Sequence, residues 1–184
     1  MQVETFPIAG VMLVRPVRHG DTRGWFEETF RADRYAEAGI ADAFVQDNQS
    51  FSARKGTVRG LHFQLAPFAQ SKLIRVLSGA ILDVAVDLRR SSPTFGRHVA
   101  VRLDAAGGAQ LYVPVGFAHG FCTLEPDTAI AYKVGAYYSR EHDRGIRWDD
   151  PDLGIDWPVT AQEAELSDKD RVTPFLRDVG QVFA

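Results

Sequence analysis

Cysteine is almost absent from this sequence. Cys122 is the only one among 184 residues, so no intrachain disulfide can form and nothing indicates an oxidising compartment. We expect Cys122 to be a small buried side chain in a strand rather than a nucleophile. The sequence also lacks an apolar run of the ~20 residues that a membrane-spanning helix needs, and its N-terminus lacks a charged-then-apolar signal pattern. These absences predict a cytoplasmic protein that does not associate with a membrane.

An excess of positive charge is lacking as well. The 24 Asp and Glu residues outnumber the 21 Lys and Arg residues, which gives a formal net charge of −3 at pH 7. No nucleic-acid partner is expected, because such a partner favours a broadly basic surface. With 184 residues, 45% of them hydrophobic, the chain is long enough for one sizeable core and too short for two ordinary domains. We expect a single domain over 1–184, with a jelly-roll core at about 10–135 and the segment 136–184 packed on it.

Short strands separated by turn residues are the main pattern along the chain. Residues 82–88 and 99–103 alternate between apolar and other side chains, as strands with unlike faces do. The other expected strands are 11–15, 25–30, 43–51, 57–65, 72–77, 110–113, 120–124 and 129–134. So many strands within ~130 residues predict a mainly β barrel or jelly roll. Short flanking helices are expected at residues 31–38, ended by Gly39, and near the C-terminus, where Thr160 and Glu163 have capping-box spacing.

Two segments, RGLHFQ at 59–64 and VPVGFAHGF at 113–121, carry the most informative motifs. Pro114, Gly116 and His119 fit the P-x-G-x-x-H pattern of cupin barrels, whose first motif normally supplies H-x-H and a downstream Glu. Here the first motif has His62 followed by Gln64, and no second His or carboxylate follows before residue 72. A divalent catalytic site usually needs three protein ligands and an open position. The motifs therefore predict a cupin-type jelly roll or β-barrel whose mouth is lined by acid and base groups and holds no metal.

The strand period places His62 inside the expected barrel. His62 lies between Leu61 and Phe63, so it projects to the face opposite these apolar neighbours. An inward histidine is either a hydrogen-bonded core residue or an acid/base group, and the period leaves both readings open. Arg59 is out of phase with His62 on a regular strand. A bulge at Gly60 would bring both side chains to the same side.

Two further polar residues lie on expected strands. Lys72 and Arg75 are three residues apart and therefore face oppositely, so that one points inward and the other to solvent. Tyr132 shares a face with Ile130 and Val134, which by periodicity alone makes it an ordinary residue of the barrel wall.

An ordered set of motifs extends over nearly the whole chain. In chain order they are D-x-R-G-x-F-x-E (21–28), Q-x-N-x-S (46–50), RGLHFQ (59–64), KLIRV (72–76), P-x-GFAHGF (114–121), YK (132–133), YY (137–138), GIRWDDP (145–151), WP (157–158) and SDKD (167–170). Each motif is weak by itself, but the set in this order and spacing is specific. It resembles the dTDP-4-dehydrorhamnose 3,5-epimerase family.

The resemblance implies proton-transfer chemistry at C3 and C5 of dTDP-4-keto-6-deoxy-D-glucose, which gives dTDP-4-keto-L-rhamnose for dTDP-L-rhamnose biosynthesis. Both protons are α to the C4 carbonyl, so inversion needs a base, an acid on the other face and a group that stabilises the enolate. The reaction requires neither a redox cofactor nor a metal. By resemblance His62 is the base, Asp170 orients it and stabilises the imidazolium, Tyr132 is the acid and Lys72 lies near the C4 oxygen. His119 is implied to bind or orient the substrate.

The resemblance also implies how the nucleotide is bound. Arg23 and Arg59 match positions that pair with the pyrophosphate, for which forked guanidinium groups are suited. The other implied contacts to sugar and nucleoside are Phe26, Glu28, Gln46, Asn48 and Tyr138. Members of the family are homodimers in which N-terminal strands cross to the partner. The resemblance therefore implies that Arg23, Phe26 and Glu28 serve the site of the neighbouring subunit.

One departure from the family pattern leaves an alternative reaction open. The family commonly has Thr-Asp or Thr-Asn before the paired tyrosines, whereas this chain has Gly-Ala at 135–136. The alternative is a related 3- or 5-mono-epimerase, or a ketoisomerase, of a dTDP-4-keto-6-deoxy sugar. Two other classes are also open. A metal-dependent cupin oxygenase would need ligands beyond His62 and His119, and a non-catalytic sugar-nucleotide binding module would have no use for His62, Asp170 and Tyr132 together.

Overall fold

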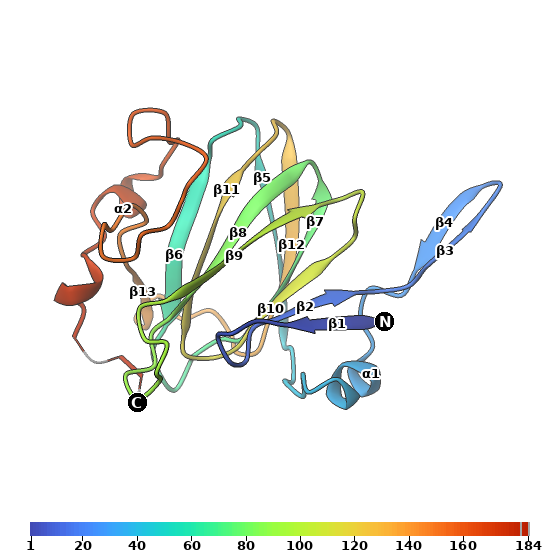
Figure 1. Ribbon diagram of the computed structural model, residues 1–184, viewed down its shortest axis with the longest axis horizontal. Coiled ribbons are helices and arrows are strands. Elements are labelled where there is room, and N and C mark those ends of the chain that lie inside the picture. The colour runs from blue at the N-terminus through green and yellow to red at the C-terminus, as the bar shows by residue number, and fades with distance from the viewer. Residues whose placement is uncertain (181, 184) are drawn as a thin grey trace.

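The computed structural model describes residues 1–180 and 182–183 and shows a mainly β protein (Figure 1). Its strands are β1 (Gln2–Thr5), β2 (Met12–Arg15), β3 (Arg18–Asp21), β4 (Gly24–Glu27), β5 (Gln46–Ser52), β6 (Val58–Gln64), β7 (Lys72–Ser78), β8 (Ala80–Asp87), β9 (His98–Asp104), β10 (Gln110–Val113), β11 (Phe117–Thr123), β12 (Thr128–Val134) and β13 (Asp143–Gly145). The helices are α1 (Ala32–Glu37), α2 (Asp168–Arg171) and the 3₁₀ turn η1 (Leu176–Asp178). No helix of the described residues is long and apolar enough to cross a membrane.

Two antiparallel sheets face each other and form the cupin-type jelly roll that the sequence predicts (Figure 1). One sheet has six strands in the order β1-β2-β10-β7-β12-β5, and the other has five in the order β13-β6-β11-β8-β9. β3 and β4 form a separate two-stranded hairpin.

The core lies between the two sheets. Ile74 and Val76 of β7 and Ile130 of β12 point inward, where they meet Ile81 of β8 and Phe121 of β11. Burying an apolar side chain of this size fully contributes about 1.5–3 kcal/mol. The same alternation decides which polar side chains enter the barrel, because a strand sends every second residue inward.

The C-terminal segment covers the outer face of the five-stranded sheet. Ile146, Leu153 and Leu176 pack against Leu61 of β6 and Val84 of β8, so that β6 and β8 are buried on both faces. Figure 1 shows this segment, in orange and red, running beside β6. Helix α2, which carries Asp170, is thereby brought against β6.

Most expected elements occur, and the expected helix 31–38 is α1. β11 begins three residues before the expected strand 120–124, and β1, β3 and β13 were not predicted. The prediction of a helix after Thr160 is wrong. Its capping bond forms, from the Thr160 backbone N–H to Glu163 Oε2 at 2.9 Å, but only one turn follows. Glu165 leaves that turn to pair its backbone with the start of β6, and helix begins only at Asp168, after the Ser167 cap.

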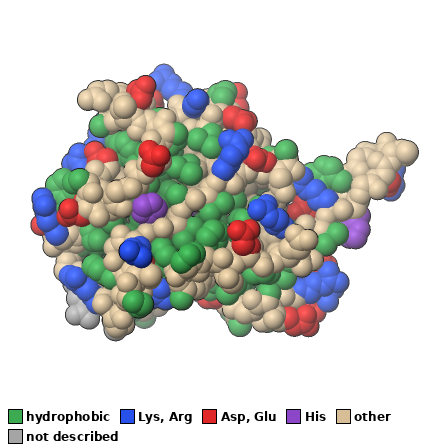
Figure 2. All heavy atoms as spheres, in the orientation of Figure 1, with side chains coloured by type: hydrophobic (Ala, Val, Ile, Leu, Met, Phe, Trp, Pro, Cys, Tyr) green, Lys and Arg blue, Asp and Glu red, His purple; other side chains and the backbone are tan. Residues whose placement is uncertain are grey.

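The expected strand 25–30 is shorter than predicted and forms part of the β3–β4 hairpin. Figures 1 and 2 show this hairpin standing clear of the body of the molecule. At its base, Arg18 donates through Nε to Glu27 Oε2 at 2.7 Å and through Nη2 to the Ala105 carbonyl at 2.9 Å. Its guanidinium also lies 4.1 Å from the centre of the Trp25 ring. These contacts fix the hairpin to the turn between β9 and β10 while its tip stays exposed.

Candidate active site

A cavity of about 440 Å³ opens between the two sheets. A second lobe of about 160 Å³ adjoins it, and the lobes share His62, Lys72 and Tyr132. The first lobe is also lined by Arg59, His119 and Asp170. The second is also lined by Gln46, Asn48, Gln64, Gln70, Tyr138, Asp143 and Lys169. The structure thus brings nine of the twelve residues singled out in the sequence around one cavity.

His62 and Asp170 form a hydrogen-bonded pair. His62 points inward from β6, since Leu61 and Phe63 belong to the cluster on the outer face. Its Nε2 lies 2.6 Å from Asp170 Oδ1. Burial alone would raise the pKa of Asp170, but the hydrogen bond and charge of His62, with help from Ser167, lower it overall. Asp170 therefore remains a carboxylate near neutral pH, able to hold Nε2 protonated.

A bulge in β6 places Arg59 on the same side as His62. His62 pairs with His119 across the two strands β6 and β11, and Arg59 pairs with Phe121. Three residues of β6 therefore span the same length as two residues of β11, which means that β6 contains one extra residue here. Gly60 allows this because its φ is +136° and a Cβ there would lie 2.5 Å from the backbone of β11. The bulge that the sequence left as a condition for this placement is present. Its consequence is a guanidinium and an imidazole at one cavity wall.

Lys72 enters the cavity from β7. It is buried, and its Nζ donates to the His62 carbonyl at 3.3 Å. Burial lowers the pKa of Lys72 to about 8, against the opposing charges of Asp143 and Asp83. Arg75 lies on the outer face of the same strand, so the predicted opposition of Lys72 and Arg75 is confirmed.

Tyr132 approaches from the opposite wall to His62. It lies on β12 of the six-stranded sheet and lines both lobes, whereas His62 belongs to the five-stranded sheet. Burial raises the pKa of Tyr132; the charge of Arg59 opposes this rise and that of Asp143 adds to it. The phenol therefore keeps its proton at neutral pH and is available as a donor.

His119 has a carboxylate partner that the sequence reading missed. Its Nε2 lies 2.7 Å from Asp83 Oδ1, and both side chains are buried. Burial lowers the pKa of His119, and Asp83 opposes this shift. Asp83 lies on β8 within a run whose alternation predicted a strand with unlike faces but gave this aspartate no role. Because the outer face of β8 is covered by the C-terminal segment, Asp83 points into the barrel instead.

The second lobe contains polar groups suited to a sugar nucleotide. Gln46 Nε2 donates to Asn48 Oδ1 at 2.8 Å, and the Tyr138 hydroxyl donates to Asp143 Oδ2 at 3.2 Å. Lys169 Nζ lies 2.5 Å from the same carboxylate oxygen. Asp143 and Lys169 were not singled out in the sequence. The only signal for Lys169 was its place within the SDKD motif, and Asp143 had none.

Arg23, Phe26 and Glu28 lie away from this cavity. Arg23 is at the hairpin tip and pairs with Asp21, and Phe26 is 70% exposed. Glu28 pairs with Arg34 at 3.2 Å. Within one chain, therefore, these three residues do not line either lobe.

The described residues contain no group of three His, Cys, Asp or Glu side chains arranged to hold a metal ion. His62 and His119 are each hydrogen-bonded to an aspartate, and the side-chain amide of Gln64 is hydrogen-bonded to backbone groups. Turnover without metal stays a prediction.

The fold and cavity define a jelly-roll protein equipped for acid–base proton transfer, with a His–Asp pair on one wall and a phenol on the other. The family model of dTDP-4-dehydrorhamnose 3,5-epimerase matches residues 5–178. The chain belongs to this family of isomerases.

Individual relatives agree with this assignment. The dTDP-4-dehydrorhamnose 3,5-epimerase of Sinorhizobium fredii is 55% identical over 177 residues, which cover 96% of this chain and 90% of the relative. The enzyme of that name from Bacillus anthracis, solved with TDP and PPi bound, is 50% identical with a TM-score of 0.92 and coverage of 95% and 98%. The dTDP-6-deoxy-D-glucose-3,5-epimerase of Legionella pneumophila, solved with dTDP-4-keto-L-rhamnose, is 44% identical with a TM-score of 0.92 and coverage of 97% and 94%.

Proposed function

We propose that this chain inverts C3 and C5 of dTDP-4-keto-6-deoxy-D-glucose to give dTDP-4-keto-L-rhamnose, within dTDP-L-rhamnose biosynthesis in the cytoplasm. The observation that carries the proposal is the placement of His62 with Asp170 on one cavity wall and of Tyr132 on the opposite wall. Inversion at a carbon α to a ketone needs a base and an acid on opposite faces, and this arrangement supplies both.

His62 removes the proton. Because Nε2 is bonded to Asp170, Nδ1 is the ring nitrogen left to act as the base. The C–H bond breaks, its electrons form the enolate of the C4 ketone, and the proton passes to the imidazole. Asp170 stabilises the resulting imidazolium because it remains a carboxylate.

Lys72 stabilises the enolate, and Tyr132 reprotonates it. The Lys72 ammonium stabilises the negative charge that develops on the C4 oxygen, and its burial makes that interaction stronger than in water. Tyr132 then gives its proton to the carbon from the opposite face, and a new C–H bond forms with inverted configuration.

The same cavity supplies the binding groups. Arg59 offers a forked donor to the pyrophosphate, while Gln46, Asn48 and Tyr138 line the lobe for the sugar and nucleoside. His119 orients the substrate from beside His62.

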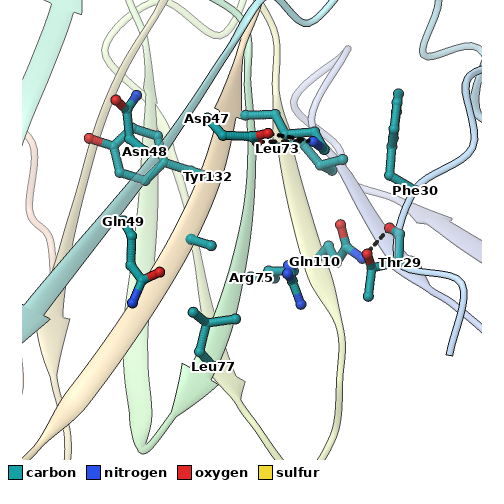
Figure 3. A pocket seen from close by; sticks show the side chains of 12 residues that line it. Thr29, Phe30, Asp47, Asn48, Gln49, Leu73, Arg75, Leu77, Gln110 and Tyr132 are labelled. Carbon is teal, nitrogen blue, oxygen red and sulfur yellow. Dashed lines mark hydrogen bonds and ion pairs between the residues drawn. The ribbon is translucent and has the colours of Figure 1, made fainter. Parts of the chain in front are cut away.

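A homodimer completes the site in this proposal. Arg23 and Phe26 lie on the hairpin and line neither lobe of their own cavity, and Arg18 holds the base of the hairpin in place. The outer face of the six-stranded sheet carries a hollow of about 400 Å³, in which Arg75 and Gln110 lie side by side (Figure 3). A second copy of the chain packed on this face would deliver Arg23, Phe26 and Glu28 to the neighbouring cavity.

NMR of the reaction in heavy water tests the proposed function. With dTDP-4-keto-6-deoxyglucose we expect deuterium at both C3 and C5 and inversion at both carbons. Inversion at one carbon would instead assign a mono-epimerase, and a moved carbonyl would assign a ketoisomerase. Absence of exchange at both carbons would contradict proton transfer as the function.

A further inference from the structure

Residues 136–139, which follow β12, are held by side-chain amides from three glutamines rather than by strand pairing. The bonds run from Gln70 Nε2 to the Ala136 carbonyl (2.8 Å), from Gln64 Nε2 to the Tyr137 carbonyl (3.1 Å), from the Tyr138 N–H to Gln46 Oε1 (3.0 Å) and from the Ser139 N–H to Gln64 Oε1 (2.7 Å). Each of four successive residues therefore gives one backbone group to a glutamine amide. We call these three glutamines the amide clamp.

Gln64 is the central member of the clamp. Its side chain is 3% exposed and uses both ends of its amide, with a further bond from Nε2 to the Phe68 carbonyl at 2.7 Å. It bonds the residue before Tyr138 and the residue after it, whereas Gln46 and Gln70 each hold one position. Gln64 also occupies the place where an H-x-H cupin motif would have its second histidine, and here that place serves the backbone.

The clamp is needed because Tyr138 has little packing of its own. Its side chain is 57% exposed at the edge of the second lobe, and its hydroxyl bonds only weakly to Asp143 at 3.2 Å. Gly135 and Ala136 bring no polar side chain that would order the segment locally. The position of the ring is therefore set through the backbone on either side of it.

We propose that Gln64 is a positioning residue for nucleotide binding, which acts by holding Tyr138 in place as a wall of the second lobe. The inference rests on the proposed function, because it assumes that this lobe receives the nucleotide part of the substrate. If the wall is already ordered in the free protein, binding does not have to supply the entropic cost of ordering it, and affinity is higher. Gln64 thus affects affinity through Tyr138 and leaves the transfer of protons by His62 and Tyr132 unchanged.

A double-mutant cycle on dTDP binding tests this inference. Calorimetry would compare wild type, Gln64→Met, Tyr138→Ala and the double variant. We expect each single variant to weaken dTDP binding about tenfold. The double variant should bind within about twofold of Tyr138→Ala, because Gln64 has nothing left to position. In turnover, Gln64→Met should raise KM about tenfold and leave kcat within about threefold.

Thr94→Val is the matched control, since it removes a hydrogen bond of 2.7 Å to the buried carboxylate of Asp87, which has no link to the clamp. It should lower the free energy of unfolding without changing dTDP affinity. If Gln64→Met does not fold, Gln70→Met removes only the bond to Ala136. Gln70→Met should weaken dTDP binding about threefold when it is introduced into the wild-type protein. It should cause no further loss when it is introduced into the Tyr138→Ala variant.

Two results would overturn the inference. One is unchanged dTDP affinity in a folded Gln64→Met protein. The other is a double variant whose loss equals the product of the two single losses, which would mean that Gln64 acts independently of Tyr138, either through the fold or through its own place in the lining of the lobe. Failure of the wild-type protein to bind dTDP would overturn the proposed function itself, and this result is distinct from both.

Discussion

The side chains of His62 and Asp170 meet at 2.6 Å although 108 residues separate them in the chain. His62 comes from β6, and Asp170 comes from the first turn of α2 in the C-terminal segment. In the proposed mechanism, the packing of this segment on the five-stranded sheet therefore supports the catalytic pair as well as the stability of the fold. Substitutions that loosen this packing should impair proton transfer even when they lie far from the cavity.

Substitution of His62 should slow proton exchange more than substitution of Asp170. His62→Ala removes the base and should abolish deuterium exchange at both carbons. Asp170→Asn leaves the imidazole misoriented and its cationic form unsupported, so the rate should fall by about 10²-fold or more. NMR exchange rates in heavy water give both values, with circular dichroism to show that the variants fold. Near wild-type exchange by a folded His62→Ala protein would place the base elsewhere, with His119 the next residue to test.

The pH dependence should report the charge of Lys72. Its pKa is about 8 in the folded protein, so its ammonium is present below pH 8 and is lost as the pH rises through that value. We expect kcat/KM to fall on the alkaline side with a midpoint near pH 8, because enolate stabilisation is lost with the charge. Tyr132, whose pKa is raised, remains protonated in this range and does not cause the fall.

A Lys72→Gln variant provides the comparison for this pH profile. It should be slower by about 10²-fold and should lack the fall near pH 8. An alkaline limb that persists unchanged in Lys72→Gln would assign the titration to another group.

Mixing of two defective chains tests whether the cavity is shared between subunits. His62→Ala and Arg23→Ala should each be impaired as homodimers. In a mixed dimer, one site would combine an intact His62 from one chain with an intact Arg23 from the other. We therefore expect activity to reappear on mixing and subunit exchange, up to half that of the wild type per mixed dimer. Two copies of His62→Ala serve as the control, and no recovery in the mixed dimer would show that each chain uses its own hairpin.

Turnover should not require a metal ion. Activity after exhaustive chelation should equal that of untreated protein, because the proposed proton transfers use only His62, Tyr132 and Lys72. Metal analysis of the same samples gives the comparison. Loss of activity on chelation, followed by recovery with one particular divalent ion, would contradict this prediction.

Much of the fold was accessible from the sequence because the period of two is strong where one face of a strand is buried. β5 and β12 show it in their burial, whereas β8 and β10 are buried along almost their whole length. β1 and β3 were missed because their residues are mostly exposed and carry no alternation. The helix after Thr160 was wrongly expected because local capping chemistry was present, while the backbone of Glu165 found a partner in β6.

The site was accessible in part for the same reason. Strand period placed His62 inside the barrel and allowed for Arg59 at a bulge, but it left Tyr132 as a wall residue. The pairing of His62 with Asp170 was implied only by family resemblance, because a contact across 108 residues depends on tertiary packing that no local pattern encodes. Asp83 was missed because alternation alone cannot distinguish a solvent-facing carboxylate from one that points into a cavity.

In the proposed reaction, His62 and Tyr132 exchange protons on opposite faces of the substrate. Tyr132→Phe tests it most directly, because the change keeps the aromatic packing and removes only the proton donor. In heavy water the enolate formed by His62 can still be quenched from its own side, so the variant should incorporate deuterium at C3 and C5 with much less inversion. Exchange and inversion measured on the same NMR sample give the ratio. Unchanged epimerisation by a well-folded Tyr132→Phe protein, or equal losses of exchange and inversion, would contradict the assignment.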